Sequence, residues 1–147
     1  MWREIIVRPF SIPLALLKRH LQRPDKKIME AVKIPNTKGQ HIAAVVHYPE
    51  TQTEKLAVLC PGYLDTKDYD SLVKLADALA ERGYTAVRFD PTGTWESEGG
   101  ISDYLTSQYI KDIGSVLEYM LKQGNFTHIL RGEAVGRREN FKQLVIH

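Results

Sequence analysis

The segment "FTHILRGEAVGRRENF", residues 126–141, decides how this chain is expected to fold. A short apolar run meets Gly132, and a second glycine, Gly136, follows four residues later. Because glycine adopts backbone conformations that other residues avoid, this spacing predicts a sharp bend from Gly132 to Gly136, directly after a buried strand. Ala134, whose side chain is a single methyl group, would occupy the apex of that bend.

The residues before this segment change their apolar period several times. Apolar side chains at every second position, on both sides of a turn at residues 36–39, predict a β-hairpin. The elements expected after it are strand 56–60, a helix within residues 68–84, strand 84–90, a longer helix within residues 102–125 and strand 126–130. Strands that alternate with amphipathic helices favour a parallel sheet. The predicted fold class is therefore α/β, a partly parallel sheet with an N-terminal antiparallel hairpin and flanking helices.

The helix ends carry their own signals. Asp68 or Asp70 is expected to cap the start of the first helix, and Gly83 is expected to end it. Ser102 is the expected cap of the second helix, which would close at Gly124.

Length and composition indicate one globular domain of 147 residues, 43% hydrophobic and 26% charged. Charge is uneven, since residues 1–27 hold seven Lys/Arg and two Asp/Glu, whereas residues 28–130 hold nine and fourteen. An acidic body without a basic stripe argues against nucleic-acid binding. The single cysteine, Cys60, excludes an internal disulfide framework and favours a cytoplasmic location.

Residues 1–27 form a basic, amphipathic arm. The longest uncharged run in it, residues 9–17, has nine residues, whereas a membrane-spanning helix needs about 20. No small-residue cleavage site follows, which argues against a signal peptide. Two interpretations stay open: residues 1–22 make weak peripheral contact with a membrane surface, or, the favoured alternative, the arm packs on the domain or on another subunit.

Three motifs in order give residues 28–136 a resemblance to a known family. They are "PGY" at Pro61–Tyr63, "FDPTGTWESEGG" ending at Gly100, and "ILRGEAVG" ending at Gly136. This order resembles the N-terminal half of α/β-hydrolases, in the branch of monoglyceride lipases, feruloyl-type esterases and serine aminopeptidases. In that family the last motif is the nucleophile elbow, G-x-S-x-G.

The resemblance implies hydrolysis of a small-molecule ester, thioester or amide by a serine nucleophile, without a metal or cofactor. It also implies that the backbone amides of Tyr63 and Val135 form the oxyanion hole. Ala134, however, stands at the nucleophile position, and Pro61 replaces the histidine of the family's "HG" motif. The catalytic acid and histidine of the family would lie beyond His147. We therefore expect this chain to be truncated and inactive by itself.

Residues 137–147 form an atypical tail, since charged residues follow Gly136 where the family has an apolar helix. The sequence "FKQLVIH" within it is a possible short strand. Four explanations stay open: a frameshifted, truncated or spliced product, an internal deletion, an engineered serine-to-alanine change, and a non-catalytic domain. The first two together are favoured.

Other candidate groups are weaker. Ser97 and the Cys60 thiol are poor candidates for a nucleophile, and no histidine has zinc-ligand spacing with a cysteine. The alternative function is a binding or oligomerisation module that offers the Tyr63 and Trp95 surface, or a sheet edge, to a partner. An open edge on the last strand predicts self-association.

Overall fold

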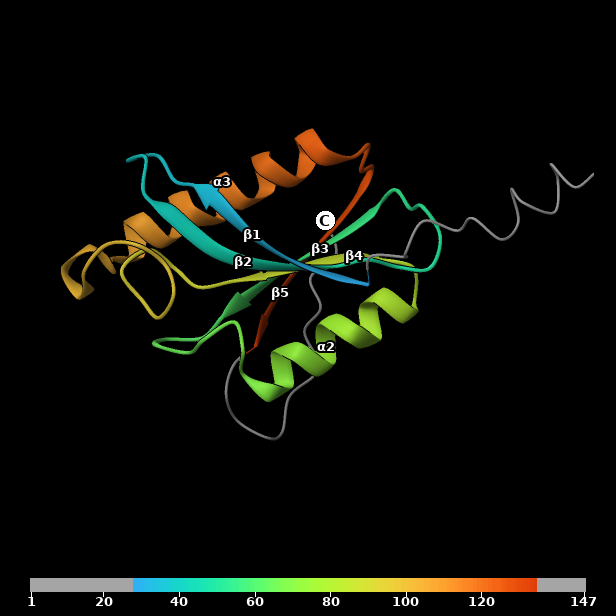
Figure 1. Cartoon of the computed structure of the whole chain (residues 1–147), viewed down its shortest axis with the longest axis horizontal. Helices are drawn as coiled ribbons and strands as arrows, with labels where there is room; N and C mark the ends of the chain where they lie inside the picture. The colour runs from blue at the N-terminus through green and yellow to red at the C-terminus, as the bar shows by residue number, and fades with distance from the viewer. Residues whose placement is uncertain (1–27, 135–147) are drawn as a thin grey trace, which may run out of the picture.

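The computed structural model describes residues 28–134, which form a five-stranded mixed sheet with one helix on each face (Figure 1). The elements are β1 (Met29–Pro35), β2 (His41–His47), β3 (Lys55–Pro61), α2 (Asp70–Glu81), β4 (Thr85–Phe89), a 3-10 helix (Ile101–Asp103), α3 (Thr106–Gln123) and β5 (His128–Ala134). The predicted arm, residues 1–27, and the predicted tail, residues 137–147, lie outside the described range.

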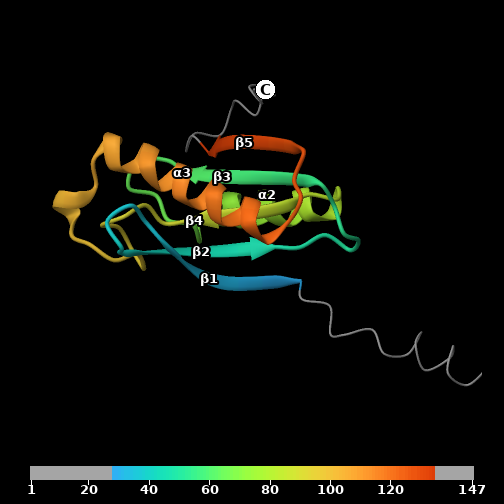
Figure 2. The same ribbon diagram turned by 90° about the horizontal axis from the view of Figure 1, so that it is seen from above.

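The strands lie in the order β1-β2-β4-β3-β5 (Figure 2). The hairpin β1-β2 is antiparallel and joins β4 antiparallel, whereas β3 pairs in parallel with both β4 and β5. This arrangement confirms the predicted fold class, including the position of the hairpin at the N-terminal edge. Within the described residues β5 pairs only with β3, so the predicted self-association through its outer edge stays a prediction.

The hairpin turn forms because one side chain satisfies its backbone. Asn36 Oδ1 accepts hydrogen bonds from the amides of Lys38, at 2.8 Å, and Gln40, at 2.9 Å. Gly39 completes the turn at a φ of 80°, a conformation that glycine adopts without steric cost. The side-chain amide nitrogen of Asn36, Nδ2, also donates to Thr92 Oγ1 at 2.9 Å, and this bond fastens the turn to the loop after β4.

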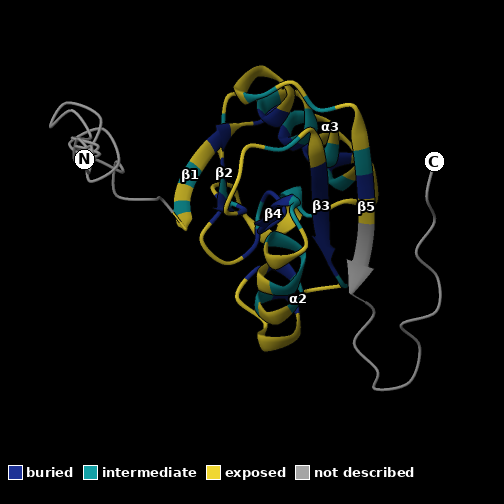
Figure 3. Ribbon diagram, turned by 90° about the vertical axis from the view of Figure 1, so that its right-hand side faces the viewer, coloured by how far each residue is buried: buried dark blue, intermediate teal, exposed yellow. Residues whose placement is uncertain are grey.

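The face covered by α3 holds the larger core. Alternate residues of the central strands point to this face, as the two-residue period of a strand requires. Its buried members include Val58, Val87 and Phe89 from the strands and Val116 and Met120 from α3. Figure 3 shows the consequence, with β3 buried along nearly its whole length between partly exposed outer strands.

The face covered by α2 holds a smaller apolar cluster. Ala57, Ala86 and Leu130 from the strands pack against Leu72 and Ala76 of α2. The two clusters together explain why β3, which faces both helices, is apolar without alternation. They also confirm the helical stripes predicted from the sequence.

The helix starts differ from the prediction, whereas the end of α2 agrees with it. Neither α-helix has a side-chain cap at its N-terminus, because Asp68 pairs with Lys67 instead and the 3-10 helix takes up Ser102. At the end of α2, Gly83 adopts a φ of 84°, and its amide donates to the carbonyl of Ala80. This is the expected glycine termination of a helix.

Neither α2 nor α3 is long and apolar enough to cross a bilayer.

Candidate functional site

The parallel strands bring the predicted site residues together at the carboxyl-terminal end of the sheet. β3 ends at Pro61 and β5 ends at Ala134, and these two residues are direct partners in the parallel register. The arrows of β3 and β5 in Figure 2 point toward the same edge, where the segment between β4 and α3 also lies. Ligands of open α/β sheets bind at the carboxyl ends of such strands. Ala134 and the turn that follows Pro61 therefore lie side by side at a favourable place.

The bend expected from Gly132 onward does not begin there. Gly132, Glu133 and Ala134 continue β5 and pair with Leu59, Cys60 and Pro61 of β3. Each backbone pair that these residues make with β3 stabilises the extended conformation up to the expected apex. Val135 and Gly136 lie outside the described residues, so a bend at the apex and the Val135 amide both stay predictions.

Tyr63, in the turn after β3, is largely exposed. The residue is 83% exposed, and within residues 28–134 its amide donates no hydrogen bond. The groups around it are engaged, since the Gly62 carbonyl accepts from the Asp65 amide at 3.1 Å. An amide without a partner beside Ala134 can donate to a ligand oxygen.

Three aromatic side chains hold this turn in place. The Tyr109 hydroxyl donates to the Pro61 carbonyl at 2.6 Å, and the Leu64 amide donates to the Tyr104 hydroxyl at 3.2 Å. The indole nitrogen of Trp95 donates to the Leu64 carbonyl at 3.2 Å. Leu64 and Trp95 both have positive φ, 58° and 46°, although neither is glycine. Such conformations cost about 1–2 kcal/mol each, and they persist where surrounding contacts impose them.

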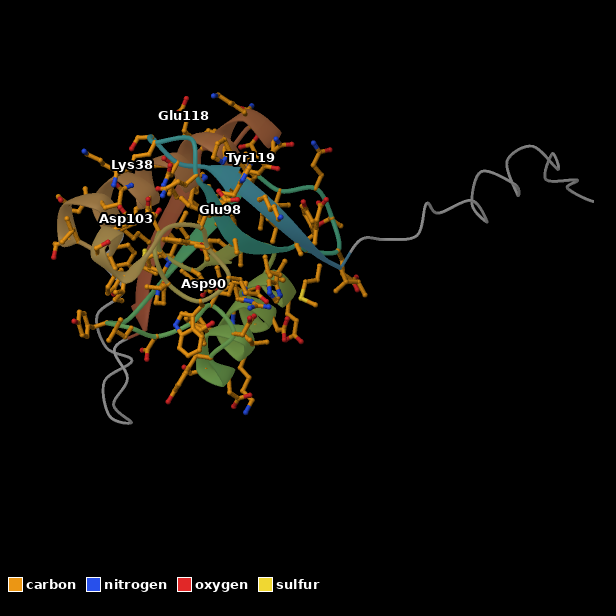
Figure 4. The ribbon with its side chains drawn as sticks, turned by 60° about the vertical axis from the view of Figure 1, so that its left-hand side comes forward. Lys38, Asp90, Glu98, Asp103, Glu118 and Tyr119 are labelled. Atoms are coloured by element: carbon orange, nitrogen blue, oxygen red, sulfur yellow. The ribbon has the colours of Figure 1, made fainter. Side chains whose placement is uncertain are left out.

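A buried carboxylate fastens the next part of the loop. Asp90, which Figure 4 labels, follows β4 and is fully buried. It accepts hydrogen bonds from the Lys67 amide, at 2.7 Å, and the Thr66 hydroxyl, at 3.1 Å. The Lys67 side chain is 3% exposed, and its amine also reaches this carboxylate. Burial alone would lower the pKa of the Lys67 amine, but hydrogen bonds to Asp68 and Glu96 and the charge of Asp90 raise that pKa above its usual range.

Arg88 of β4 extends this network across the face covered by α2. Its guanidinium donates to the Lys67 carbonyl at 2.8 Å and pairs with the Asp68 carboxylate. Its Nε donates to His47 Nε2 at 2.9 Å, and His47 Nδ1 lies 2.8 Å from an Asp77 oxygen. The loop between β3 and α2 is thus held on one side by aromatic residues and on the other by paired charges.

The remaining candidates have structural roles. Ser97 is buried, and its hydroxyl donates to the Asp90 carbonyl at 2.6 Å and accepts from the Ala43 amide at 2.8 Å. The Cys60 thiol is also buried, inside the larger core. Neither is placed as a nucleophile.

The described histidines lie away from Ala134, the last residue of β5. His128 begins β5 at its opposite end, and His47 pairs with Ala86 near the start of β4. His41 lies on β2, three strands away from β5, and pairs with Glu98. Across residues 28–134, no group of three or more His, Cys, Asp or Glu side chains could hold a metal ion.

Two hollows open on the described surface. A groove of about 160 Å³ lies at the carboxyl-terminal end of β3, and it is lined by Pro61, Tyr63, Tyr104, Leu105, Thr106 and Tyr109. A wider hollow of about 600 Å³ is lined by the loops before β3 and before β5, at the other end of these strands. The roles of Tyr104, Lys67 and Asp90 in holding this loop were not predicted from the sequence. Of the three, only Asp90 occupies a position that suggests such a role, because it directly follows a buried strand.

Comparison with solved structures identifies this architecture. The esterase Est1E from Butyrivibrio proteoclasticus, solved with ferulic acid, matches with a TM-score of 0.64 and 24% identity over 70% of this chain. The Pyrococcus furiosus esterase Pf2001 matches with a TM-score of 0.63 and 14% identity over 71%. An α/β serine hydrolase homologue from Coxiella burnetii matches with a TM-score of 0.62 and 22% identity over 71%.

These matches cover 42%, 39% and 50% of the respective solved chains, so this chain spans half of their length or less. No protein-family model and no curated protein sequence matches it. Similarity at this level of identity concerns the fold. The described part of the chain therefore has a partial α/β-hydrolase fold.

Proposed function

We propose that this chain is related to the serine esterases of the α/β-hydrolase fold and carries one side of their acyl-transfer site, with the nucleophile position empty. The register of β3 and β5 supports this proposal, because it places Ala134 next to the turn that presents the Tyr63 amide. The similarity in fold to solved esterases supports the same reaction class.

The ends of β3 and β5 would have separate roles in acyl transfer. In acyl transfer a nucleophile attacks the carbonyl carbon of an ester or amide, and negative charge develops on the carbonyl oxygen. The Tyr63 amide, with that of Val135, would donate hydrogen bonds to this oxygen. The methyl group of Ala134 has no lone pair with which to attack. The residues present can therefore hold a carbonyl group, but they cannot cleave it.

The experiment compares the chain with its Ala134→Ser variant, using p-nitrophenyl acetate. We expect the parent to release p-nitrophenol at the buffer rate. The variant should acquire one acetyl group at position 134, with release of p-nitrophenol, whereas the parent has no side-chain oxygen there to accept it. Acetylation should be slow and should not lead to turnover, since no described histidine lies beside residue 134 to act as the base. Intact-mass spectrometry reads the acetyl group, and peptide mapping locates it.

A second pair of variants tests the amide itself. In the Ala134→Ser background, Tyr63→Pro removes the backbone donor, whereas Tyr63→Ala removes only the side chain. The proline variant should lose at least about tenfold more acetylation rate than the alanine variant. Catalytic turnover by the parent chain, or equal acetylation of parent and Ala134→Ser, would contradict the proposal.

A further inference from the structure

We propose that the wider hollow, at the amino-terminal ends of β3 and β5, binds residues 16–27 of the same chain. These residues are the part of the basic arm closest in sequence to β1. The hollow is lined by residues 48–54, Thr85, Met120 and residues 123–126. It lies at the opposite end of the strands from Ala134, so the inference goes beyond the proposed function and does not depend on it.

The strand β1 begins beside this hollow. The carbonyl of Ile28, the residue before β1, accepts a hydrogen bond at 2.9 Å from the amide of Tyr48, which lines the hollow. In Figure 2 the start of β1 lies at the same end of the sheet as the loop between β2 and β3 and the segment between α3 and β5. The arm is thus covalently tethered next to the hollow, which gives residues 16–27 a high effective concentration there.

The hollow is large, and hydrogen bonds join the two loops that form its walls. Its volume of about 600 Å³ falls in the range of about 300–1,000 Å³ typical of pockets that enclose a ligand. The Glu54 carbonyl accepts from the amides of Thr127, at 2.9 Å, and His128, at 3.1 Å. The Thr127 hydroxyl also donates to the Glu54 carboxylate at 3.0 Å. Side chains of several residues can therefore enter a space whose walls are already formed.

Apolar side chains in the hollow extend the larger core. Met120 belongs to the core cluster under α3, and Tyr48 and Phe126 pack against that cluster while remaining partly exposed. The arm segment offers three leucines to cover this surface: Leu16, Leu17 and Leu21. Removing apolar surface from water on both sides favours docking.

The hollow and the arm segment carry opposite charge. The thirteen lining residues include Glu50 and Glu54, both exposed, and no lysine or arginine. Residues 16–27 hold five Lys/Arg and one Asp, whereas residues 1–15 hold two Lys/Arg and one Glu. Because opposite charges attract across a partly exposed surface, the hollow favours residues 16–27 over the rest of the arm.

A nitroxide spin label on the arm of the full chain tests the proposal. Gln22→Cys supplies the attachment site, since Cys60 is buried, and peptide mapping verifies that only position 22 is labelled. The label reduces the intensity of nearby amide signals in ¹H–¹⁵N spectra. We expect strong loss at residues 48–54 and 123–126 and little loss at residues 78–83, at the end of α2 on the other face of the sheet. An arm that is only tethered would affect both groups equally.

Two pairs of glutamine substitutions separate docking from tethering. Glu50→Gln with Glu54→Gln removes the negative charge of the hollow. The ratio of docked to undocked arm, measured by relaxation enhancement at residues 48–54, should fall about twofold to fivefold, as expected for exposed ion pairs. Glu81→Gln with Glu118→Gln is the matched control, because both residues are exposed and neither lines the hollow. It should leave the ratio unchanged, and unshifted signals from residues 104–109 verify the fold of each variant.

A mixed sample distinguishes docking within one chain from docking between copies. Isotope-labelled chains without the nitroxide are mixed with spin-labelled chains of natural isotope content, and we expect no loss of signal. The inference would be overturned by loss at residues 48–54 in this sample, by no loss there in the spin-labelled chain itself, by equal loss on the two faces, or by equal effects of the two glutamine pairs. A failed Ala134→Ser acetylation would remove the proposed function and leave this docking site in place.

Discussion

The two faces of the sheet are built differently. The face under α3 is mainly apolar and includes the fully buried ring of Phe89, although the carboxylate of Asp112 on α3 is buried as well. The face under α2 holds a smaller apolar cluster and, beside it, the paired charges of Arg88, Lys67 and Asp90. Both Arg88 and Phe89 belong to β4, so one strand supplies both kinds of packing on its alternate sides.

The difference suggests a division of labour. Apolar packing stabilises the domain without directional requirements. The paired charges require specific partners, and within the described residues every buried side-chain nitrogen and oxygen has one. Thr66, Lys67 and Asp68, which bond to Asp90 or Arg88, belong to the loop that begins with Tyr63. We infer that the α3 face contributes most of the stability, whereas the α2 face fixes the position of this loop.

His47 shows how directional the polar face is. Arg88 Nε can only donate, so His47 Nε2 must accept and carry no proton. The other ring nitrogen, Nδ1, then holds the proton and donates it to Asp77. Protonation of Nε2 would break the bond to Arg88. Burial, and to a lesser degree the charge of Arg88, lower the pKa of His47 against the opposing effect of Asp77.

The largest expected effect lies on the apolar face. Phe89→Ala should lower the free energy of unfolding by about 3–5 kcal/mol, because it removes a buried ring and leaves a cavity. Urea denaturation followed by circular dichroism measures it. The loss should be equal at pH 7 and pH 5.5, since Phe89 packs in the apolar cluster. A loss below about 1 kcal/mol would contradict the assignment of stability to this face.

A smaller effect, dependent on pH, is expected on the polar face. Because the pKa of His47 is lower in the folded chain than its ordinary value of 6.5, only the unfolded chain gains this proton as the pH falls below 6.5. The free energy of unfolding should therefore decrease with falling pH, by at most about 1.4 kcal/mol per pH unit, until the folded-state pKa is reached.

Two histidine variants test this dependence by urea denaturation at pH values from 7.5 to 5. Glutamine can replace both hydrogen bonds of His47, so His47→Gln should remove that part of the slope. His128→Gln, at an exposed histidine, is the control and should keep the slope of the parent. An unchanged slope in His47→Gln would show that this network does not sense pH.

Much of the fold was predictable because it depends on the spacing of apolar residues within short segments. The hairpin, the helical stripes and Gly83 were all visible in the sequence, since each follows from the spacing of apolar residues or from a glycine. The contact between Arg88 and His47 was not predicted, because it depends on the pairing of β2 with β4, which is a tertiary property.

The site was predictable only in part. Pro61 and Ala134 were singled out by resemblance, and they are direct partners in the register of β3 and β5. The positive φ of Leu64 and Trp95 had no signal, because both residues usually avoid it and contacts distant in sequence impose it. Asp68 did not act as a helix cap for a similar reason, since two buried cations compete for its carboxylate.

The central claim is that β5 places Ala134 directly beside the turn after β3. Nuclear Overhauser contacts on the isotope-labelled chain test it, because neighbouring strands lie about 4.8 Å apart. The account predicts backbone contacts between Pro61 and Ala134 and between Ala57 and Leu130. Contacts shifted by two residues, or no contact from residues 132–134 to β3, would contradict it.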